Sequence, residues 1–252
     1  MASRRFAVAL VAAAACTGSV QAASLTQSAT KFRLCAVDKN DVDLVAFSDA
    51  TQAFCALLKK FGYFTFGSIQ QVSACLVKVE NGRLAQSMES QSKGRRGKKR
   101  KSMRSMKALL AAEVEQGKHK KGGVLADPSA AMGLLWVRRG LMFWARLFEL
   151  EAKRLSESGF EWGAAGTLLE QSKRAYDLEI AKFHGWIARN GFMVSLRSAP
   201  DWEVLCERAG MPMKCKELAE ELSTWSREIE ALARRMRAMH VKNDLEDARR
   251  CM

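Results

Sequence analysis

The chain has 252 residues, of which 48% are hydrophobic and 27% charged, as expected for one globular domain with additional segments. Its formal net charge of +14 is concentrated in residues 93–107, residues 118–121 and the pair Arg4 and Arg5, and elsewhere 27 basic residues face 27 acidic ones. This neutral body argues against a nucleic-acid-binding domain. Seven cysteines without a CxxC pair and only three histidines argue against a metal site.

Residues 1–23 have the composition of a targeting leader. Two arginines precede an apolar run over residues 6–15, and small residues suited to cleavage follow at residues 22–23. This order is typical of a secretory signal, whereas the lack of any acid before Asp38 is also typical of an organellar transit peptide. We therefore predict localisation in the secretory pathway or an organelle.

Helical periodicity begins after residues 24–41, which we expect to form an extended N-terminal segment. Residues 42–61 carry apolar side chains at helical spacings and are followed by Gly62, which predicts a first helix. A second helix is predicted over residues 68–80, ended by the Asn-Gly pair at residues 81–82.

Residues 86–103 are rich in like charges and poor in apolar residues, which predicts a disordered basic insertion. A solubilising linker is one interpretation, and docking on anionic lipid, nucleic-acid contact or proteolytic processing are others. No aromatic residues alternate with the basic ones, which disfavours base recognition. For membrane attraction the candidates are Lys98, Lys99 and Arg100.

The remaining segments are also helical by pattern. Apolar residues recur every three or four positions in residues 103–115, 128–156, 167–194 and 214–240, and residues 241–252 read as a fraying polar tail. No sustained two-residue alternation occurs between them, so the predicted fold class is all-α.

The helix that begins near Pro128, with Asp127 as its expected cap, carries the most informative surface. On its helical wheel Trp136 and Gly140 share one stripe, flanked by Arg139. One interpretation is an interior helix whose arginines reach water; the other is a recognition surface on which an indole stacks on a sugar or its basic neighbours bind an anion.

His184 lies beside an apolar stripe, near Asp177. A single histidine in such a place is usually a hydrogen-bonded structural residue. A catalytic pair is the alternative, but no nucleophile elbow, metal-ligand spacing or glycine-rich phosphate loop accompanies it. We predict a protein that is not an enzyme and needs no cofactor.

Two segments resemble motifs of the glycolipid transfer protein family. Residues 134–143, LLWVRRGLMF, resemble its Trp-(Leu)-(Lys/Arg)-Arg-Gly-Leu signature, and residues 175–200, AYDLEIAKFHGWIARNGFMVSLRSAP, resemble its AYxxxLxxYHxWxxxxxFxxAxxxAP segment. The resemblance extends loosely over the predicted domain, residues 42–240. It implies a two-layer sandwich of about eight helices, monomeric, with a sphingolipid headgroup on the surface and a lipid tunnel between the layers.

The resemblance also implies roles for individual side chains. Trp136 would stack on the first sugar, His184 would bind the ceramide amide carbonyl, and Lys78 would contact the headgroup. Gln71 and Cys75 stand where the family has an acid and an asparagine. Gln71 loses the charge assistance of a carboxylate, a difference on the order of 1 kcal/mol, so we expect altered headgroup selection.

The choice of headgroup follows from two further positions. The phosphate-binding branch of the family has arginines where this chain has Met132 and Trp136, which favours a glycosylceramide. Arg139 and Lys78 keep ceramide 1-phosphate as an alternative. A lipid sensor or scaffold with weak transfer is a third hypothesis, since the acid at position 71 is missing.

The implied function is non-enzymatic transfer of a sphingolipid between membranes, with transient contact to anionic surfaces. Because transferring each methylene to water costs roughly 0.8 kcal/mol, an apolar tunnel would lower the barrier to exchange. The expected tunnel residues are Phe143, Leu147, Phe148, Phe183, Ile187 and Phe192. The expected apolar membrane contacts are Trp202, Tyr63 and Phe64. Cytoplasmic localisation, usual for the family, is the alternative to the leader's prediction.

The expected oxidation state of two cysteines depends on the compartment in which the protein resides. Cys206 and Cys215 flank a loop that contains Gly210 and Pro212. We expect them to pair if the protein is exported and to remain buried thiols if it is not.

Overall fold

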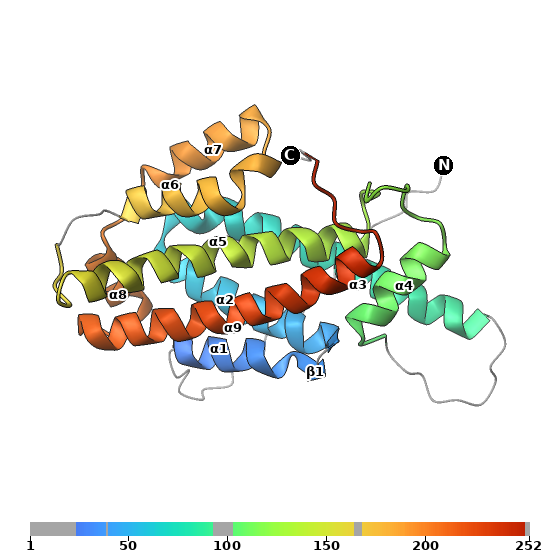
Figure 1. Ribbon diagram of the computed structural model, residues 1–252, viewed down its shortest axis with the longest axis horizontal. Helices are drawn as coiled ribbons and strands as arrows, with labels where there is room; N and C mark the ends of the chain where they lie inside the picture. Colours follow the sequence, from blue (N-terminus) through green and yellow to red (C-terminus); the bar gives the residue numbers. More distant parts are fainter. Residues whose placement is uncertain (1–23, 39, 93–102, 164–167, 250–252) are drawn as a thin grey trace, which may run out of the picture.

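The computed structural model describes residues 24–38, 40–92, 103–163 and 168–249, and nearly all regular structure within them is helical (Figure 1). The leader and most of the basic insertion, with Lys98, Lys99 and Arg100, lie outside the described residues. The all-α fold class is confirmed. The elements are α1 (Leu25–Leu34), β1 (Ala36–Asp38), β2 (Asp41–Val42), α2 (Leu44–Phe61), η1 (Tyr63–Thr65), α3 (Phe66–Ser92), α4 (Met106–Glu115), α5 (Ala130–Glu157), α6 (Leu168–Glu179), η2 (Ala181–Phe183), α7 (Trp186–Leu196), α8 (Trp202–Ala209) and α9 (Cys215–Lys242).

Two long helices, α5 and α9, lie side by side through the middle of the molecule (Figure 1). The Ser226 hydroxyl of α9 donates to the Ala145 carbonyl of α5 at 2.9 Å, a direct link between them. Helices α3 and α6 pack on α5, whereas α1 packs on α9 and α2 on α1. The result is the two-layer arrangement expected for the family. Among the described helices, none is long and apolar enough to cross a bilayer.

Aromatic side chains fill the space between the layers. Phe54 of α2 stacks on Trp225 of α9 with ring centroids 4.5 Å apart, and Phe148 of α5 meets the same indole edge-on at 5.0 Å. Such ring pairs contribute about 0.5–1.5 kcal/mol beyond their buried area. This aromatic core fixes α2, α5 and α9 against one another.

The N-terminal segment is not extended, as residues 24–41 were expected to be. Ser24 caps α1 by accepting a hydrogen bond from the Gln27 amide at 3.1 Å. Leu25 and Phe32 are buried, because apolar residues recur along one face of this short helix. The expectation was wrong because a ten-residue helix carries fewer than three turns of pattern.

Helix α3 does not end at Gly82 but continues to Ser92, so the start of the expected disordered insertion is helical. A Cβ atom on Gly82 would lie 2.7 Å from the Cβ of Ala130. The glycine therefore marks a close approach between α3 and the first turn of α5. Sequence alone could not separate this packing role from a helix stop.

The single helix expected over residues 167–194 is divided into α6, η2 and α7. His184 has extended backbone angles, and Gly185 occupies the N-cap position of α7. Glycine has low helix propensity, so the break falls where it costs least. The break takes His184 off a helix and leaves it between two.

Residues 243–249, the described part of the segment after α9, do not fray, although residues 241–252 were expected to. The side chain of Leu245 is buried, and the Asp247 carboxylate accepts a hydrogen bond from the Leu125 amide at 3.0 Å. Burial alone would raise the pKa of Asp247, but hydrogen bonds from Arg249 and Leu125 lower it to about 2. The tail is thus fixed by a buried carboxylate that stays ionised at neutral pH.

Candidate functional site

The start of α5 is fixed by a side chain other than the expected one. The Ser129 hydroxyl accepts from the Met132 amide at 3.1 Å and caps the helix. Asp127 instead binds the ammonium group of Lys78 on α3, with an Nζ–Oδ1 distance of 2.5 Å. The predicted headgroup lysine therefore lies beside the N-terminus of α5, matched by an acid.

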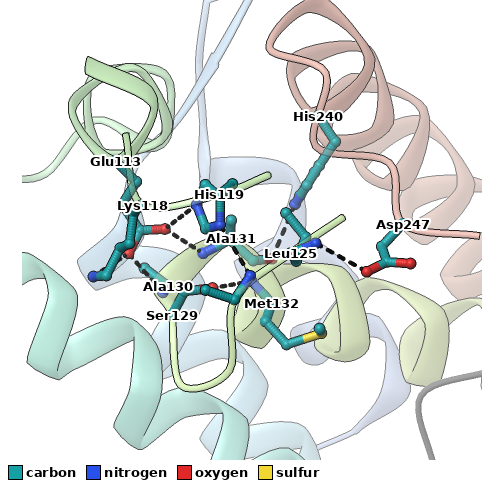
Figure 2. A network of polar contacts seen from close by, with 11 residues as sticks. Glu113, Lys118, His119, Leu125, Ser129, Ala130, Ala131, Met132, His240 and Asp247 are labelled. Atoms are coloured by element: carbon teal, nitrogen blue, oxygen red, sulfur yellow. Dashed lines mark hydrogen bonds and ion pairs between the residues drawn. The ribbon is translucent and has the colours of Figure 1, made fainter. Parts of the chain in front are cut away.

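A buried carboxylate completes this anchor (Figure 2). Glu113 of α4 accepts hydrogen bonds from the Ala130 and Ala131 amides at 2.9 Å each. Lys118 donates to it at 2.9 Å, and Nε2 of His119 lies 3.2 Å from it. Burial would raise the pKa of Glu113, but the hydrogen bonds from Lys118, Ala131 and Ala130 lower it below its ordinary value. A negative charge at a helix N-terminus is favourable, so Glu113 positions α5.

A second buried histidine ties α9 to the same turn. Nε2 of His240 lies 3.2 Å from the Ala131 carbonyl oxygen (Figure 2). Its Nδ1 lies 2.9 Å from the Met236 carbonyl oxygen. Burial, with nearby Arg138, lowers the pKa of His240 to about 4. The ring is therefore neutral at physiological pH and can donate to one of the two carbonyls at a time, and it packs between the two central helices.

Helices α3 and α5 also approach closely at Gly133. A Cβ atom there would lie 2.6 Å from the Cys75 carbonyl oxygen and 3.3 Å from the Cβ of Lys78. This contact places both residues, predicted for the headgroup, against α5 one turn before Trp136. Burial raises the pKa of the Cys75 thiol to about 11, so it remains protonated. Gln71 lies one turn earlier on α3 and is half-buried.

Trp136 stands in a cluster of rings and cations. Its indole is 5% exposed and stacks on the His184 imidazole, with centroids 5.6 Å apart and planes at 29°. The Arg139 guanidinium carbon lies 5.1 Å from the indole centroid, and Phe183 meets the indole edge-on at 6.5 Å. The structure thus brings together three of the predicted headgroup residues, with the indole covered by the imidazole.

His184 presents a buried polar atom to this cluster. Its Nδ1 lies 3.0 Å from the Tyr176 hydroxyl, and its Nε2 is buried with no hydrogen-bond partner in the described part of the chain. Burial, with the nearby Arg139 charge, lowers the pKa of His184. When the Tyr176 hydroxyl donates to Nδ1, the neutral ring carries its proton on Nε2. Sequence reasoning missed Tyr176, although it belongs to the motif that includes His184.

The C-terminal tail forms one edge of the cluster. The Arg139 guanidinium lies 3.4 Å from the Phe183 ring centroid and donates to the Asp247 carbonyl oxygen. Neighbouring Arg138 binds the Glu246 carboxylate at 2.5 Å. These tail contacts had no signal in the sequence, because they join residues 108 positions apart.

The predicted tunnel residues divide into two groups. Phe143, Leu147 and Phe148 are buried between the layers, and Phe183 and Phe192 are half-buried. Ile187, in contrast, is 81% exposed. Its assignment to the tunnel was wrong, because the break before α7 turns its side chain outward.

Two predicted membrane contacts are also wrong. Phe64 is buried beside Trp144, with ring centroids 6.4 Å apart. Trp202 is 4% exposed, packs on Phe148, and donates through its indole nitrogen to Gln171 at 3.3 Å. Both side chains belong to the core. They were expected to be exposed because Phe64 lies in a short aromatic segment and Trp202 lies at the start of a helix.

Exposed aromatic residues occur instead on η1, on the start of α3 and on α7. Tyr63 is 76% exposed and stacks on Phe66 with centroids 5.8 Å apart, and Trp186 is 79% exposed. Helix α7 and η1 are in contact, so these side chains belong to neighbouring elements. Sequence analysis predicted Tyr63 but missed Trp186.

The cysteines provide neither a metal site nor a disulfide among the described residues. Cys206 and Cys215 are buried free thiols, and burial raises the pKa of Cys206 to about 12. Within the described ranges, no group of three or more His, Cys, Asp or Glu residues is arranged to hold a metal ion.

Comparisons with known proteins agree with this geometry. A family model described as glycolipid transfer protein (GLTP) matches residues 42–211. The fold is similar to that of mouse ceramide-1-phosphate transfer protein in its apo form, at 19% identity and a TM-score of 0.71, covering 88% of this chain and 98% of that one. It is also similar to FAPP2, described as selecting simple glycosphingolipids with the GLTP fold, at 19% identity and a TM-score of 0.64, covering 89% and 98%.

A fungal glycolipid transfer protein, HET-C2, is similar at 15% identity and a TM-score of 0.62, covering 86% of this chain and 95% of that one. At these identities the structural likeness establishes the fold alone. The family model, however, spans more than half of the chain and includes Trp136 and His184. The chain belongs to the glycolipid transfer protein family.

Proposed function

We propose that this protein binds one sphingolipid and carries it between membranes without changing it chemically. The observation that carries the proposal is Nε2 of His184, a buried nitrogen beside the Trp136 indole with no protein partner in the described structure. Leaving a buried polar group unsatisfied costs about 1–3 kcal/mol. A ceramide amide carbonyl is an acceptor that would remove this cost.

The cluster around Trp136 suits a sugar better than a phosphate. An indole face binds the apolar face of a sugar ring, which here requires the His184 imidazole that covers the indole to move aside on binding. The Arg139 guanidinium is already held by the Asp247 carbonyl and the Phe183 ring. We therefore propose a glycosylceramide as ligand. Ceramide 1-phosphate is the second candidate, because the Arg139 cation adjoins the indole. A sensor or scaffold with weak transfer is the third, favoured by the amide at Gln71.

The hydrocarbon chains are proposed to enter between the layers, beside Phe143 and Phe148. These residues are buried in aromatic contacts, so entry requires an adjoining element to move. Helix α7 is suited to this, because Leu196 is its only buried residue. Elements with few buried contacts open at the lowest free energy.

Contact with the donor membrane is proposed at the exposed rings of Tyr63, Phe66 and Trp186. Aromatic side chains insert favourably at the headgroup level of a bilayer. The basic run that includes Lys98 and Lys99 would add attraction to an anionic leaflet. We propose that this exchange takes place in the secretory pathway or an organelle, on the basis of the leader-like composition of residues 1–23.

Vesicle-to-vesicle transfer tests the proposal with two variants. Trp136→Ala removes the stacking surface, and His184→Phe keeps a ring against Trp136 while removing the Nε2 donor. Both should lower transfer of fluorescent glucosylceramide at least tenfold, with circular dichroism unchanged. Trp162→Ala is the matched control, since this half-buried indole lies beyond the end of α5 and donates to the Met213 carbonyl.

Undiminished transfer by His184→Phe would reject the site. Faster transfer of ceramide 1-phosphate than of glucosylceramide by the unmodified protein would select the second candidate. Stoichiometric binding without multiple turnover would select the sensor or scaffold.

A further inference from the structure

A basic cavity lies on the side of α5 that faces α9 and the C-terminal tail. Its volume is about 620 Å³, within the range of roughly 300–1,000 Å³ usual for small-ligand sites. We call it the arginine pocket. Its basic lining residues are Arg138, Arg139, Arg146, Lys182, Arg234 and Arg237.

The arginine pocket has more positive than negative charge. Six basic side chains line it against three acidic ones, Glu179, Glu230 and Glu246. Each acid has a partner on the wall: Arg146 with Glu179 at 3.2 Å, Arg234 with Glu230 at 3.8 Å, and Arg138 with Glu246 at 2.5 Å. The cavity therefore has a surplus of three positive charges.

Two of the surplus cations have no acid close to them. Among the described residues, no carboxylate lies within ion-pair distance of Lys182 or Arg237. Lys182 comes from η2 and Arg237 from α9, so the two cations enter from different elements. Cations that different elements bring to one cavity can bind the same anion.

A buried arginine with one unpaired nitrogen supports the same conclusion. Arg138 is more than nine-tenths buried, and its Nη1 has no hydrogen-bond partner in the described structure. The second oxygen of Glu246 is also buried without a partner. Glu246 thus satisfies only part of the hydrogen-bonding capacity of Arg138. An anion with more acceptor oxygens could take its place.

The rest of the lining indicates that the anion carries an organic group. Met142, Phe183 and Ala233 contribute apolar surface to the cavity. A volume of about 620 Å³ far exceeds the roughly 30 Å³ of one water molecule. The cavity therefore has room for a charged group together with a carbon skeleton.

We propose that the arginine pocket binds a phosphate monoester, in competition with Glu246. A monoester carries between one and two negative charges near pH 7 and three acceptor oxygens, which suit Lys182, Arg237 and Arg138 together. The phosphate belongs either to a membrane lipid or to a soluble metabolite. This site is separate from His184 Nε2, although the two regions share Arg139 and Phe183.

Two binding measurements distinguish the sources of the phosphate. Calorimetric titration with glycerol 3-phosphate at 0.1 M salt tests the soluble source. Cosedimentation with neutral vesicles containing phosphatidic acid tests the lipid source, with phosphatidylserine vesicles of equal surface charge as reference. We expect saturable binding of one phosphate per chain in at least one of these measurements.

Charge-matched variants test the location. Lys182→Gln with Arg237→Gln should weaken binding about tenfold. Lys216→Gln with Lys242→Gln should leave it unchanged, since both lysines are exposed on α9 and neither lines the cavity. Glu246→Gln should strengthen binding severalfold, because it removes the competing carboxylate.

Three outcomes would overturn the proposal. They are the absence of saturable binding with both probes, equal weakening by the two double variants, and weaker binding by Glu246→Gln in a folded protein. His184→Phe provides the separation from sphingolipid transfer. It should bind glycerol 3-phosphate or phosphatidic acid as the unmodified protein does, even where glucosylceramide transfer is lost.

Discussion

Replacing Glu113 with glutamine should destabilise the protein more than any comparable change on its surface. The carboxylate is fully buried and accepts from two amides of α5 and from Lys118. Glutamine keeps the shape of the side chain and one acceptor oxygen. Its NH2 group, however, would face a hydrogen-bond donor, and the negative charge of the carboxylate is lost. Lys118 and the start of α5 are then left without their counter-charge.

The expected magnitude follows from these contacts. Hydrogen bonds to a charged group contribute about 1.5–3 kcal/mol each, and Glu113 accepts two from buried amides, of which the remaining amide oxygen of glutamine recovers part. The ion pair with Lys118 adds little, because the Lys118 side chain is 35% exposed and solvent screens it. We expect a loss of about 3 kcal/mol in the free energy of unfolding. For a chain of this length that corresponds to a fall in Tm of about 6–12 °C.

Urea denaturation followed by circular dichroism measures this loss. Glu115→Gln is the matched control, because Glu115 lies on the same helix and is exposed, and it should change stability by less than about 0.5 kcal/mol. A loss below about 1 kcal/mol for Glu113→Gln would refute the anchoring role.

The pH dependence provides an independent check. The folded pKa of Glu113 lies below the ordinary value of 4.5, so its contribution is complete above pH 4.5 and disappears as the pH falls through the folded pKa. The difference between the unmodified protein and Glu113→Gln should therefore shrink below pH 4.5. A difference that is constant across this range would contradict the assigned charge.

Two further outcomes test packing and thiol chemistry. Gly133→Ala would place a Cβ atom 2.6 Å from the Cys75 carbonyl oxygen and should lower stability by about 1–3 kcal/mol in thermal unfolding, whereas Gly191→Ala, with no atom within 4 Å, should be neutral or stabilising. Cys206, with a pKa of about 12 and a buried thiol, should resist iodoacetamide at pH 8 until urea unfolds the chain, as mapped by mass spectrometry. Alkylation of native Cys206 at the rate of free cysteine would contradict its burial.

The sequence predicted the parts of the site that lie within one motif or one regular helix. The resemblance of two separate segments to motifs of one family predicted that Trp136 and His184 share a site, and the structure stacks their rings. Helix α9 was predicted almost to the residue, because Leu218, Leu222 and Trp225 repeat at steps of four and three. Long periodic patterns average out local ambiguity.

Contacts between distant segments could not be predicted in the same way. Trp202 carries the apolar signature of a membrane contact, yet its surroundings are set by Phe148 and Gln171, which only the fold brings to it. The polar tail likewise contains Asp247, whose buried position depends on an amide of residue 125. A polar residue is therefore predicted correctly to be exposed only where no distant segment supplies it with a hydrogen-bond partner.

The close crossing of α3 and α5 at Gly133 has a consequence for how selectivity is divided within the protein. Because the backbones of α3 and α5 touch at this crossing, no side chain there can adapt. The wall that these two helices form therefore presents nearly the same groups to every ligand. The other wall, which we propose to be α7, is lightly anchored and can yield to chains of different length. We expect substitutions on the first wall to change which headgroup is accepted. Substitutions on the second should change only the range of acyl lengths.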